Sequence, residues 1–256
     1  MTHPAKTYLS LREDRYRPIF SRSNSFAPIK RIWRAVLGDQ YLEEIDAFGF
    51  VTATDLQDIA DAVGPLAGRT LVDIGCGGGG PGLWVARRTG ADLVGIDILQ
   101  EAVDQAAEFS KGFADAPRAS FRVGSFTGTK LPAASAAAVM SVDAFWMVMD
   151  KLKALEEVAR IMAPGGVFAM TTWADANVVW PEWFEDTGLQ VVSCRETRRW
   201  KENQLAVYEA VSARREELAA VLDPAALAIL LSEAEEAPKA MASMRRSLVI
   251  ARRVED

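Results

Sequence analysis

VDIGCGGGGPG, the sequence from Val72 to Gly82, joins an apolar run to a row of glycines. The run Thr70–Ile74 has the length and composition of a buried strand. Glycines directly after a strand let the chain turn sharply and let a ligand approach the backbone closely. Pro81 suits the first turn of a following helix. The sequence here therefore predicts a strand, a ligand-binding turn and a helix, in that order.

Strand and helix patterns alternate outward from this turn. Seven apolar runs predict strands, namely Thr70–Ile74, Ala91–Ile96, Ser120–Val123, Ala136–Ser141, Val167–Trp173, Leu189–Glu196 and Ser247–Val254. Most of the segments between them show the spacing of amphipathic helices. This alternation predicts an α/β fold, a doubly wound and mostly parallel seven-stranded sheet with helices on both faces. The last two strands are expected to form an antiparallel edge.

The chain divides into four predicted segments. In order they are an N-terminal helical cap (1–67), a cofactor-binding core (68–199), a helical lid inserted over the ligand edge of the sheet (200–246) and the last core strand (247–256). A plain helical appendage is the alternative to the lid. Within the cap, Thr54 followed by Gln57 has the spacing of a helix capping box.

Composition excludes several classes of protein. The chain has 256 residues, of which 50% are hydrophobic and 25% charged, as in an ordinary globular protein. Its net charge of −6 argues against a broad basic surface for nucleic acid. No apolar run approaches the ~20 residues of a membrane span, and the first residues lack the apolar region of a signal peptide. Only two cysteines are present, which fits neither a disulfide framework nor a Cys-rich metal site, so we expect a cytoplasmic protein.

The single histidine is His3. Catalytic triads that use histidine as a base and histidine-rich metal sites are therefore not expected, and we predict no metal. A general base would have to be a carboxylate, a tyrosine, a lysine, a cysteine or water.

The glycines alone do not identify the ligand. Gly75, Gly77 and Gly80 satisfy the spacing of a dinucleotide-binding turn. Asp97 follows at a distance suited to holding a ribose. Asp73 separates the alternatives, because a carboxylate is unfavourable beside a pyrophosphate but favourable beside a ligand that carries an ammonium and a sulfonium. The pattern therefore favours S-adenosylmethionine over NAD.

At these residues the chain resembles the class I S-adenosylmethionine-dependent methyltransferases, in particular the small-molecule, methyltransferase-11-like members. VDIGCGGGGPG resembles their first motif, GIDIL at Gly95–Leu99 their ribose-binding strand end, and LEEVARIMAPGGVFAMTTW at Leu155–Trp173 their later helix and fifth strand. The resemblance covers Arg69–Trp173, and three motifs in order are much more specific than one. It implies a Rossmann-like methyltransferase fold and S-adenosylmethionine as cofactor.

The resemblance also implies cofactor contacts by Asp73, Gly75, Cys76, Gly77, Asp97, Ile98, Gly124, Ser125, Phe126 and Ser141. Asp97 is expected to accept hydrogen bonds from both ribose hydroxyls, with a helix N-cap as the alternative, and Ile98 to pack on the adenine. Asp73 is expected to act through the loop and water. Ser125 stands where relatives often carry an acidic residue that reads the adenine amine, so the chain departs from the family there. Ser141 is expected near the methionine part.

The segment SVDAFWMVMD, Ser141–Asp150, is expected to face the acceptor. It lacks the Asn- or Asp-Pro-Pro-aromatic signature of nucleic-acid amino methyltransferases. Asp143 is the candidate catalytic residue, which would steer or deprotonate the acceptor, and the alternative is that it caps the loop. The expected acceptor-binding residues are Phe145, Trp146, Trp173 and Trp33, and the cap residues expected to close over the cofactor include Tyr16, Phe20 and Phe26.

We therefore expect methyl transfer to a small-molecule acceptor, an apolar or aromatic specialised metabolite, with O-, N- and C-methylation left open. Three alternatives remain. They are a non-methylating rearrangement or cyclisation that uses the same cofactor, an NAD-dependent oxidoreductase, and a non-catalytic binding module. A second copy of the chain is left open as a partner, whereas nucleic acid and membrane are not expected.

Overall fold

The computed structural model describes residues 15–20, 26–46 and 48–254, so His3 lies outside the described residues. Its centre is a seven-stranded sheet in the order β3-β2-β1-β4-β5-β7-β6. The strands are β1 (Thr70–Ile74), β2 (Asp92–Asp97), β3 (Ala119–Val123), β4 (Ala136–Val142), β5 (Met162–Asp175), β6 (Leu189–Glu196) and β7 (Met244–Arg253). Strands β1 to β5 are parallel, and β7 runs antiparallel between β5 and β6. The predicted fold class is confirmed.

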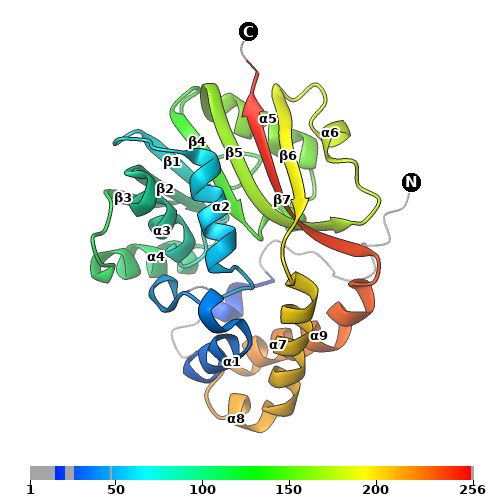
Figure 1. Cartoon of the computed structure of the whole chain (residues 1–256). Coiled ribbons are helices and arrows are strands. Elements are labelled where there is room, and N and C mark those ends of the chain that lie inside the picture. Colours follow the sequence, from blue (N-terminus) through cyan, green and yellow to red (C-terminus); the bar gives the residue numbers. More distant parts are fainter. Residues whose placement is uncertain (1–14, 21–25, 47, 255–256) are drawn as a thin grey trace.

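Helices cover both faces of the sheet (Figure 1). On one face lie α2 (Ala53–Val63), α3 (Gly80–Thr89) and α4 (Gln100–Gly112), and on the other lie α5 (Lys151–Ile161) and α6 (Trp180–Trp183). Successive residues of β1 point to opposite faces, so that Leu71 joins the apolar core under α2 and α3 while Val72 joins the one under α5. Because both faces are covered, the central strands are almost entirely apolar.

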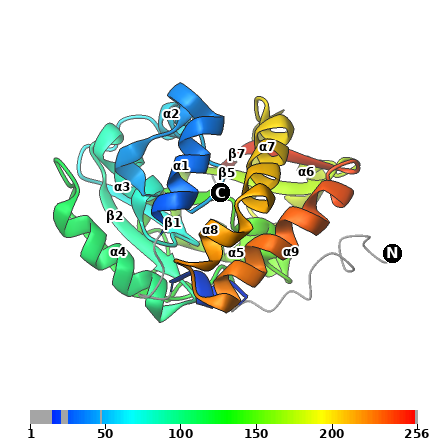
Figure 2. The same cartoon turned by 90° about the horizontal axis from the view of Figure 1, so that it is seen from below.

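A further helical layer lies beyond one end of the sheet (Figures 1 and 2). It consists of α1 (Ala27–Leu37), α7 (Trp200–Ala213), α8 (Arg215–Ala219) and α9 (Pro224–Ala240). Trp33 of α1 shares one apolar core with Val207 of α7 and Leu230 of α9. The first helix and the inserted helices are therefore packed together, whereas α2 packs on the sheet. Among the described residues, none of the helices has the length and apolarity needed to cross a bilayer.

Short 3-10 turns complete the chain. They are η2 (Arg17–Phe20), η3 (Gly38–Gln40), η4 (Glu43–Ile45) and η5 (Phe145–Met147). The turn η2 connects the two parts of the molecule, because Gln105 Nε2 of α4 donates a hydrogen bond to the carbonyl of Phe20 and Tyr16, just before η2, bonds to α9.

The capping box of α2 begins two residues earlier than the sequence analysis predicted. Thr52 is the N-cap, and its hydroxyl accepts a hydrogen bond from the Asp55 N–H while the Asp55 carboxylate accepts one from the Thr52 N–H, both at 3.1 Å. Thr54 lies inside the first turn and donates its hydroxyl to Gln40 Oε1 at 2.7 Å. Each threonine is followed three positions later by a residue that can complete a capping box, Asp55 for Thr52 and Gln57 for Thr54. The carboxylate of Asp55 is a stronger hydrogen-bond acceptor than the amide of Gln57.

One position in the four-glycine run has no room for a side chain. A Cβ on Gly80 would lie 1.5 Å from the carbonyl oxygen of Ile45, whereas one on Gly78 would meet nothing within 4 Å. Gly80→Ala must therefore displace η4 from α3, and we expect it to lower the free energy of unfolding by about 1–3 kcal/mol. Gly78→Ala is the matched control and should change it much less. Urea denaturation measures both values, and equal values for the two variants would contradict this packing.

Candidate active site

A cavity of about 610 Å³ lies between the sheet and the helical layer. It is lined by the glycine loop after β1, by residues that follow β2, β3 and β4, and by residues of η2, α7 and α9. Open α/β sheets bind their ligands beyond the carboxyl ends of their parallel strands, and this cavity lies there. Its volume is typical of a site for small molecules. It is therefore the candidate active site.

The glycine loop is tied to the end of β2. The N–H groups of Gly75 and Cys76 both donate to the carbonyl of Ile96, at 2.7 and 3.0 Å. Gly75 has a φ of +75°, and a Cβ there would come within 2.4 Å of the Cβ of Ala144, so that only glycine fits. Gly77 has a φ of +51°. The N–H groups of Gly75 and Cys76 are therefore already bonded within the protein. A ligand would contact the glycine Cα atoms of the loop instead.

Asp97 ends β2 and is held from two sides. Its Oδ2 accepts a hydrogen bond from the N–H of Gly77 and its Oδ1 one from the N–H of Leu99, both at 3.0 Å. Each oxygen keeps a further lone pair, so the fixed carboxylate can still accept hydrogen bonds from two ligand hydroxyls. Burial raises the pKa of Asp97, against the hydrogen bonds from these backbone groups. The N-cap position of α4 is Leu99, not Asp97.

Asp73 lies beneath the loop and is 2% exposed. A Cβ on Gly82 would come within 2.5 Å of its Oδ2, so the carboxylate packs against the first turn of α3. Burial, and then the nearby charge of Asp97, raises the pKa of Asp73 to about 7. Two neighbouring carboxylates in one pocket favour a cationic ligand.

Burial also raises the pKa of the Cys76 thiol well above its ordinary value, which makes that cysteine an unreactive packing residue.

The structure brings most of the expected cofactor contacts to this cavity. Besides the residues already described, Ile98, Gly124, Ser125 and Phe126 line it. The Ser125 backbone exchanges two hydrogen bonds with that of Gly128, and its hydroxyl lies 3.2 Å from that of Thr127. At the position where relatives often carry an acid, this chain therefore presents a tight turn with two hydroxyls.

Three expected residues are not among those that line the cavity. Ser141 is in the middle of the sheet, between β1 and β5, and is fully buried. Phe145 turns into the core, where its ring lies 5.5 Å from that of Phe126. Trp33 packs within the helical layer, with its ring 5.3 Å from that of Phe48. Ser141 is held within the sheet, and Phe145 and Trp33 are held in apolar cores. We do not retain these three as ligand contacts.

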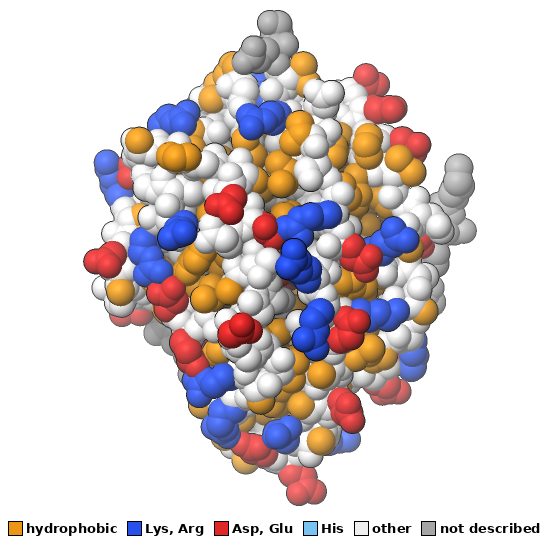
Figure 3. All heavy atoms as spheres, viewed as in Figure 1, with side chains coloured by type: hydrophobic (Ala, Val, Ile, Leu, Met, Phe, Trp, Pro, Cys, Tyr) orange, Lys and Arg blue, Asp and Glu red, His pale blue; other side chains and the backbone are white. Residues whose placement is uncertain are grey.

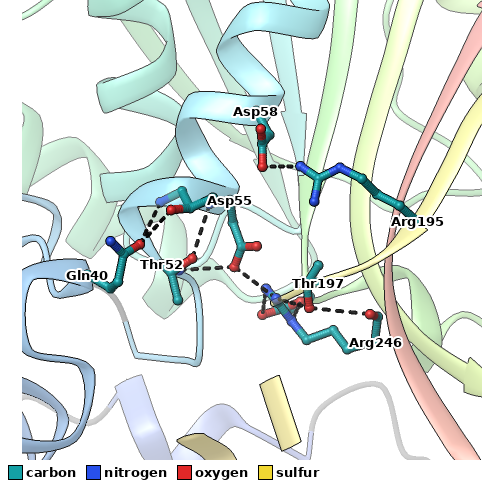
Figure 4. Close-up of polar contacts among 9 residues, drawn as sticks. Gln40, Thr52, Asp55, Asp58, Arg195, Thr197 and Arg246 are labelled. Atoms are coloured by element: carbon teal, nitrogen blue, oxygen red, sulfur yellow. Dashed lines mark hydrogen bonds and ion pairs between the residues drawn. The ribbon is translucent and has the colours of Figure 1, made fainter. Parts of the chain in front are cut away.

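Asp143 lines the cavity, but its carboxylate is occupied. Arg246 of β7 donates from Nε to Oδ1 at 2.9 Å and from Nη2 to Oδ2 at 3.0 Å. Arg246 is 1% exposed, and its Nη1 also donates to Asp55 and Thr197, at 2.8 and 3.0 Å (Figure 4). This buried ion pair holds the Asp143 side chain in the wall, and the charge of Arg246 opposes the rise that burial causes in the pKa of Asp143. We therefore replace the role of base expected for Asp143 with that of a structural partner of Arg246.

Aromatic side chains form part of the cavity wall. The ring of Trp173 stands edge-on to those of Trp146 and Phe50, with centroids 6.2 and 6.3 Å apart. Trp146 is fixed by a hydrogen bond of 2.9 Å from its Nε1 to the carbonyl of Asp143. The cap residues Tyr16, Phe20 and Phe26 also line the cavity. Such walls suit a flat or apolar molecule.

Sequence reasoning missed the polar residues that the helical layer contributes. Gln204 and Tyr208 of α7 and Glu233 of α9 line the cavity, and nothing in their Ala/Glu-rich surroundings distinguished them. It also missed Lys151, whose Nζ donates to the carbonyls of Phe145, Trp146 and Val148 and so fixes η5. Burial lowers the pKa of Lys151 to about 8.

Comparison with known proteins agrees with this geometry. Residues 72–170 match a family model described as "Methyltransferase domain". The sterol 24-C-methyltransferase of Yarrowia lipolytica is 32% identical over 130 residues, which are 50% of this chain. The match covers 34% of that relative, so the chain spans about a third of its length.

Two solved structures share the fold. A putative sarcosine dimethylglycine methyltransferase from Galdieria sulphuraria gives a TM-score of 0.67 at 18% identity, covering 88% of this chain and 98% of that one. The [4+2]-cyclase SpnF gives a TM-score of 0.68 at 21% identity, covering 90% of this chain and 94% of that one. The central segment is therefore a methyltransferase domain of the class I fold, and the resemblance seen in the sequence is confirmed at that level.

Asp73 should make the stability of the ligand-free protein depend on pH. Its pKa rises from the ordinary 3.8 to about 7 in the folded state, so between these values the folded state binds more protons than the unfolded chain. The stability that Asp73 contributes must then fall as pH rises through this window, by up to about 1.4 kcal/mol per pH unit. Asp73→Asn removes this titration. The difference in unfolding free energy, wild type minus variant, should decrease between about pH 5 and pH 7 in urea denaturation; a constant or growing difference would show that Asp73 is not the group that titrates.

Proposed function

We propose that this chain is an S-adenosylmethionine-dependent methyltransferase that acts on a small, largely apolar acceptor. The observation that carries the proposal is the single cavity shared by the Asp97 carboxylate, the glycine loop and the aromatic wall of Trp146 and Trp173. A nucleoside and an apolar molecule held in this cavity would meet in one space. The domain match and the sequence relative support the same reaction.

The residues fit this cofactor at three points. The free lone pairs of Asp97 suit the two ribose hydroxyls, and Ile98 and Phe126 offer apolar surface to the adenine. Burial raises the pKa of both Asp73 and Asp97, and a bound ammonium or sulfonium would favour their ionised, negatively charged form. The same charge disfavours the pyrophosphate of NAD. When bound, S-adenosylmethionine supplies a methyl group activated by the positive charge on its sulfur.

The protein itself would contribute by positioning the acceptor and by excluding water from the site. Holding an acceptor in line with the methyl group can be worth about 7–11 kcal/mol of the barrier when the geometry is good. The tryptophans fix one wall, because Trp146 is bonded to the backbone and Trp173 packs between Trp146 and Phe50. Residues of α7 and α9 line the cavity, and the helical layer would help to exclude water from it. We propose that residues 200–246 act as the lid of this site, since α7 and α9 line the cavity.

Location and partners follow from the same features. We propose a cytoplasmic protein, because Cys194 is exposed and unpaired, which a reducing compartment preserves. Nucleic acid is not proposed as the substrate, since acidic and basic side chains are interspersed over the face seen in Figure 3.

One alternative has a specific observation in its favour. The cyclase SpnF has the same fold at a similar TM-score, so the fold alone does not distinguish methyl transfer from a cyclisation. Product analysis does, because only methyl transfer converts the cofactor to S-adenosylhomocysteine.

Asp97→Asn should weaken S-adenosylmethionine binding about tenfold or more in titration calorimetry, because hydrogen bonds to a charged acceptor are worth about 1.5–3 kcal/mol. Asp92→Asn is the matched control, since Asp92 lies at the other end of β2 and pairs with the exposed Arg118 at 3.1 Å. Incubation of the wild type with S-adenosylmethionine and a small-molecule extract should yield S-adenosylhomocysteine.

Tighter binding of NAD than of S-adenosylmethionine would refute the cofactor assignment. Consumption of an extract component without S-adenosylhomocysteine would refute methyl transfer and favour the cyclisation.

A further inference from the structure

A buried polar pair interrupts the apolar wall of the cavity. The hydroxyl of Tyr16 donates a hydrogen bond to Oε1 of Glu233 at 2.5 Å, across 217 residues of sequence. Both side chains line the cavity, and that of Glu233 is 12% exposed. Burial raises the pKa of Glu233, while Tyr16 and Arg15 oppose this shift. A carboxylate is costly in such a place unless a partner offsets its burial.

Within the described part of the chain, the partners of Glu233 do not use the full capacity of its carboxylate. Among the described residues, Glu233 has the hydrogen bond from Tyr16 and an ion pair with Arg15 at 4.0 Å. A carboxylate has about four acceptor positions, so acceptor capacity remains on Glu233. A ligand with N–H or O–H groups is the natural complement.

A second unsatisfied acceptor lies close by. Gln204 and Tyr208 are one turn apart on α7, and Gln204 Nε2 donates to the hydroxyl of Tyr208 at 2.8 Å. Gln204 is 6% exposed, and its Oε1 is buried without a hydrogen-bond partner in the described part of the chain. Burial, and then the charge of Glu233, raises the pKa of the Tyr16 phenol, and the nearby Tyr208 adds to this shift. We call the four residues Tyr16, Gln204, Tyr208 and Glu233 the polar corner.

The charge of the cavity also favours a proton-donating, cationic ligand over an anionic one. Six carboxylates line it within the described residues, at Asp46, Asp73, Asp97, Asp143, Asp175 and Glu233, against one lysine, Lys151. Lys151 keeps its positive charge while it donates to backbone carbonyls. Arg246, Arg15 and Lys30 pair with Asp143, Glu233 and Asp46, so the six carboxylates still outnumber the cationic groups beside them. Nor do the described residues hold three His, Cys, Asp or Glu grouped to bind a metal ion that would bridge to an anionic ligand. A carboxylate or phosphate on the acceptor would therefore be repelled.

We propose that the polar corner recognises a proton-donating group, an ammonium foremost, on an acceptor that is otherwise apolar. An ammonium brings three donors and a charge, and it gains from the aromatic rings of Tyr16, Tyr208 and Phe50 around it. A hydroxyl fits less well, and an anionic group does not fit. This inference rests on the proposed function, because it treats the cavity as the place where cofactor and acceptor meet.

Three probes with one skeleton test the polar corner: 4-phenylbutylamine, 4-phenylbutan-1-ol and 4-phenylbutanoic acid. Their affinities are measured by titration calorimetry with saturating S-adenosylhomocysteine. We expect the wild type to bind the amine about tenfold or more tighter than the alcohol, and the acid weakest. Glu233→Gln should remove most of the preference for the amine. Glu235→Gln is the matched control, since Glu235 loses the same charge on the same helix but its side chain is 75% exposed.

Tyr16→Phe keeps the carboxylate and should keep the preference for the amine within about threefold, which provides a second variant if Glu233→Gln does not fold. The inference is overturned if the acid binds as well as the amine, if none of the probes binds, or if Glu233→Gln retains the wild-type preference. Titration with S-adenosylhomocysteine alone is measured first in each protein. Loss of that binding in the wild type would count against the proposed function, whereas intact cofactor binding without an amine preference would count against the polar corner alone.

Discussion

The bend after β1 is held by hydrogen bonds to the end of β2. Gly75 and Cys76 donate to the carbonyl of Ile96, and Gly77 donates to the carboxylate of Asp97. These bonds fix the loop and the carboxylate relative to each other before any ligand arrives. A side chain at position 75 would collide with Ala144, so the loop can take this path only with glycine there. The cofactor proposal depends on this arrangement.

A second constraint attaches the helical layer to the sheet. Arg246 lies near the start of β7 and binds Asp55 of α2 and Thr197 after β6 (Figure 4). It also binds Asp143 after β4. Thr197 and Arg246 lie on either side of the inserted helices, so one buried guanidinium fixes both of their connections to the sheet. Arg246 also lies 5.5 Å from the centre of the Trp173 ring. The position of the acceptor wall is therefore coupled to the position of the helices that cover it.

The sequence predicted the sheet well because the sheet depends on local patterns, and the cofactor contacts are a prediction built on patterns of the same kind. The apolar runs, the glycines after Thr70–Ile74 and the carboxylate at Asp97 lie within short stretches with a definite spacing. The acceptor side was predicted less well because it depends on distant pairs. Asp143 was expected to act as a base because the sequence does not show that Arg246, 103 residues later, binds it. Glu233 is one of many acids in an Ala/Glu-rich stretch, and only the packing of α9 against Tyr16 sets it apart.

For Trp33 and Phe145, the sequence alone could not distinguish a ligand contact from a core position. Their apolar character fitted a ligand wall and a core equally well, and tertiary packing placed both in cores.

A crystal structure of the protein with S-adenosylhomocysteine tests the central claim most directly. The account predicts both ribose hydroxyls within hydrogen-bond distance of Asp97, with the sulfur directed toward Trp146 and Trp173. A nucleoside bound elsewhere, or a ribose that leaves Asp97 without a ligand contact, would contradict it.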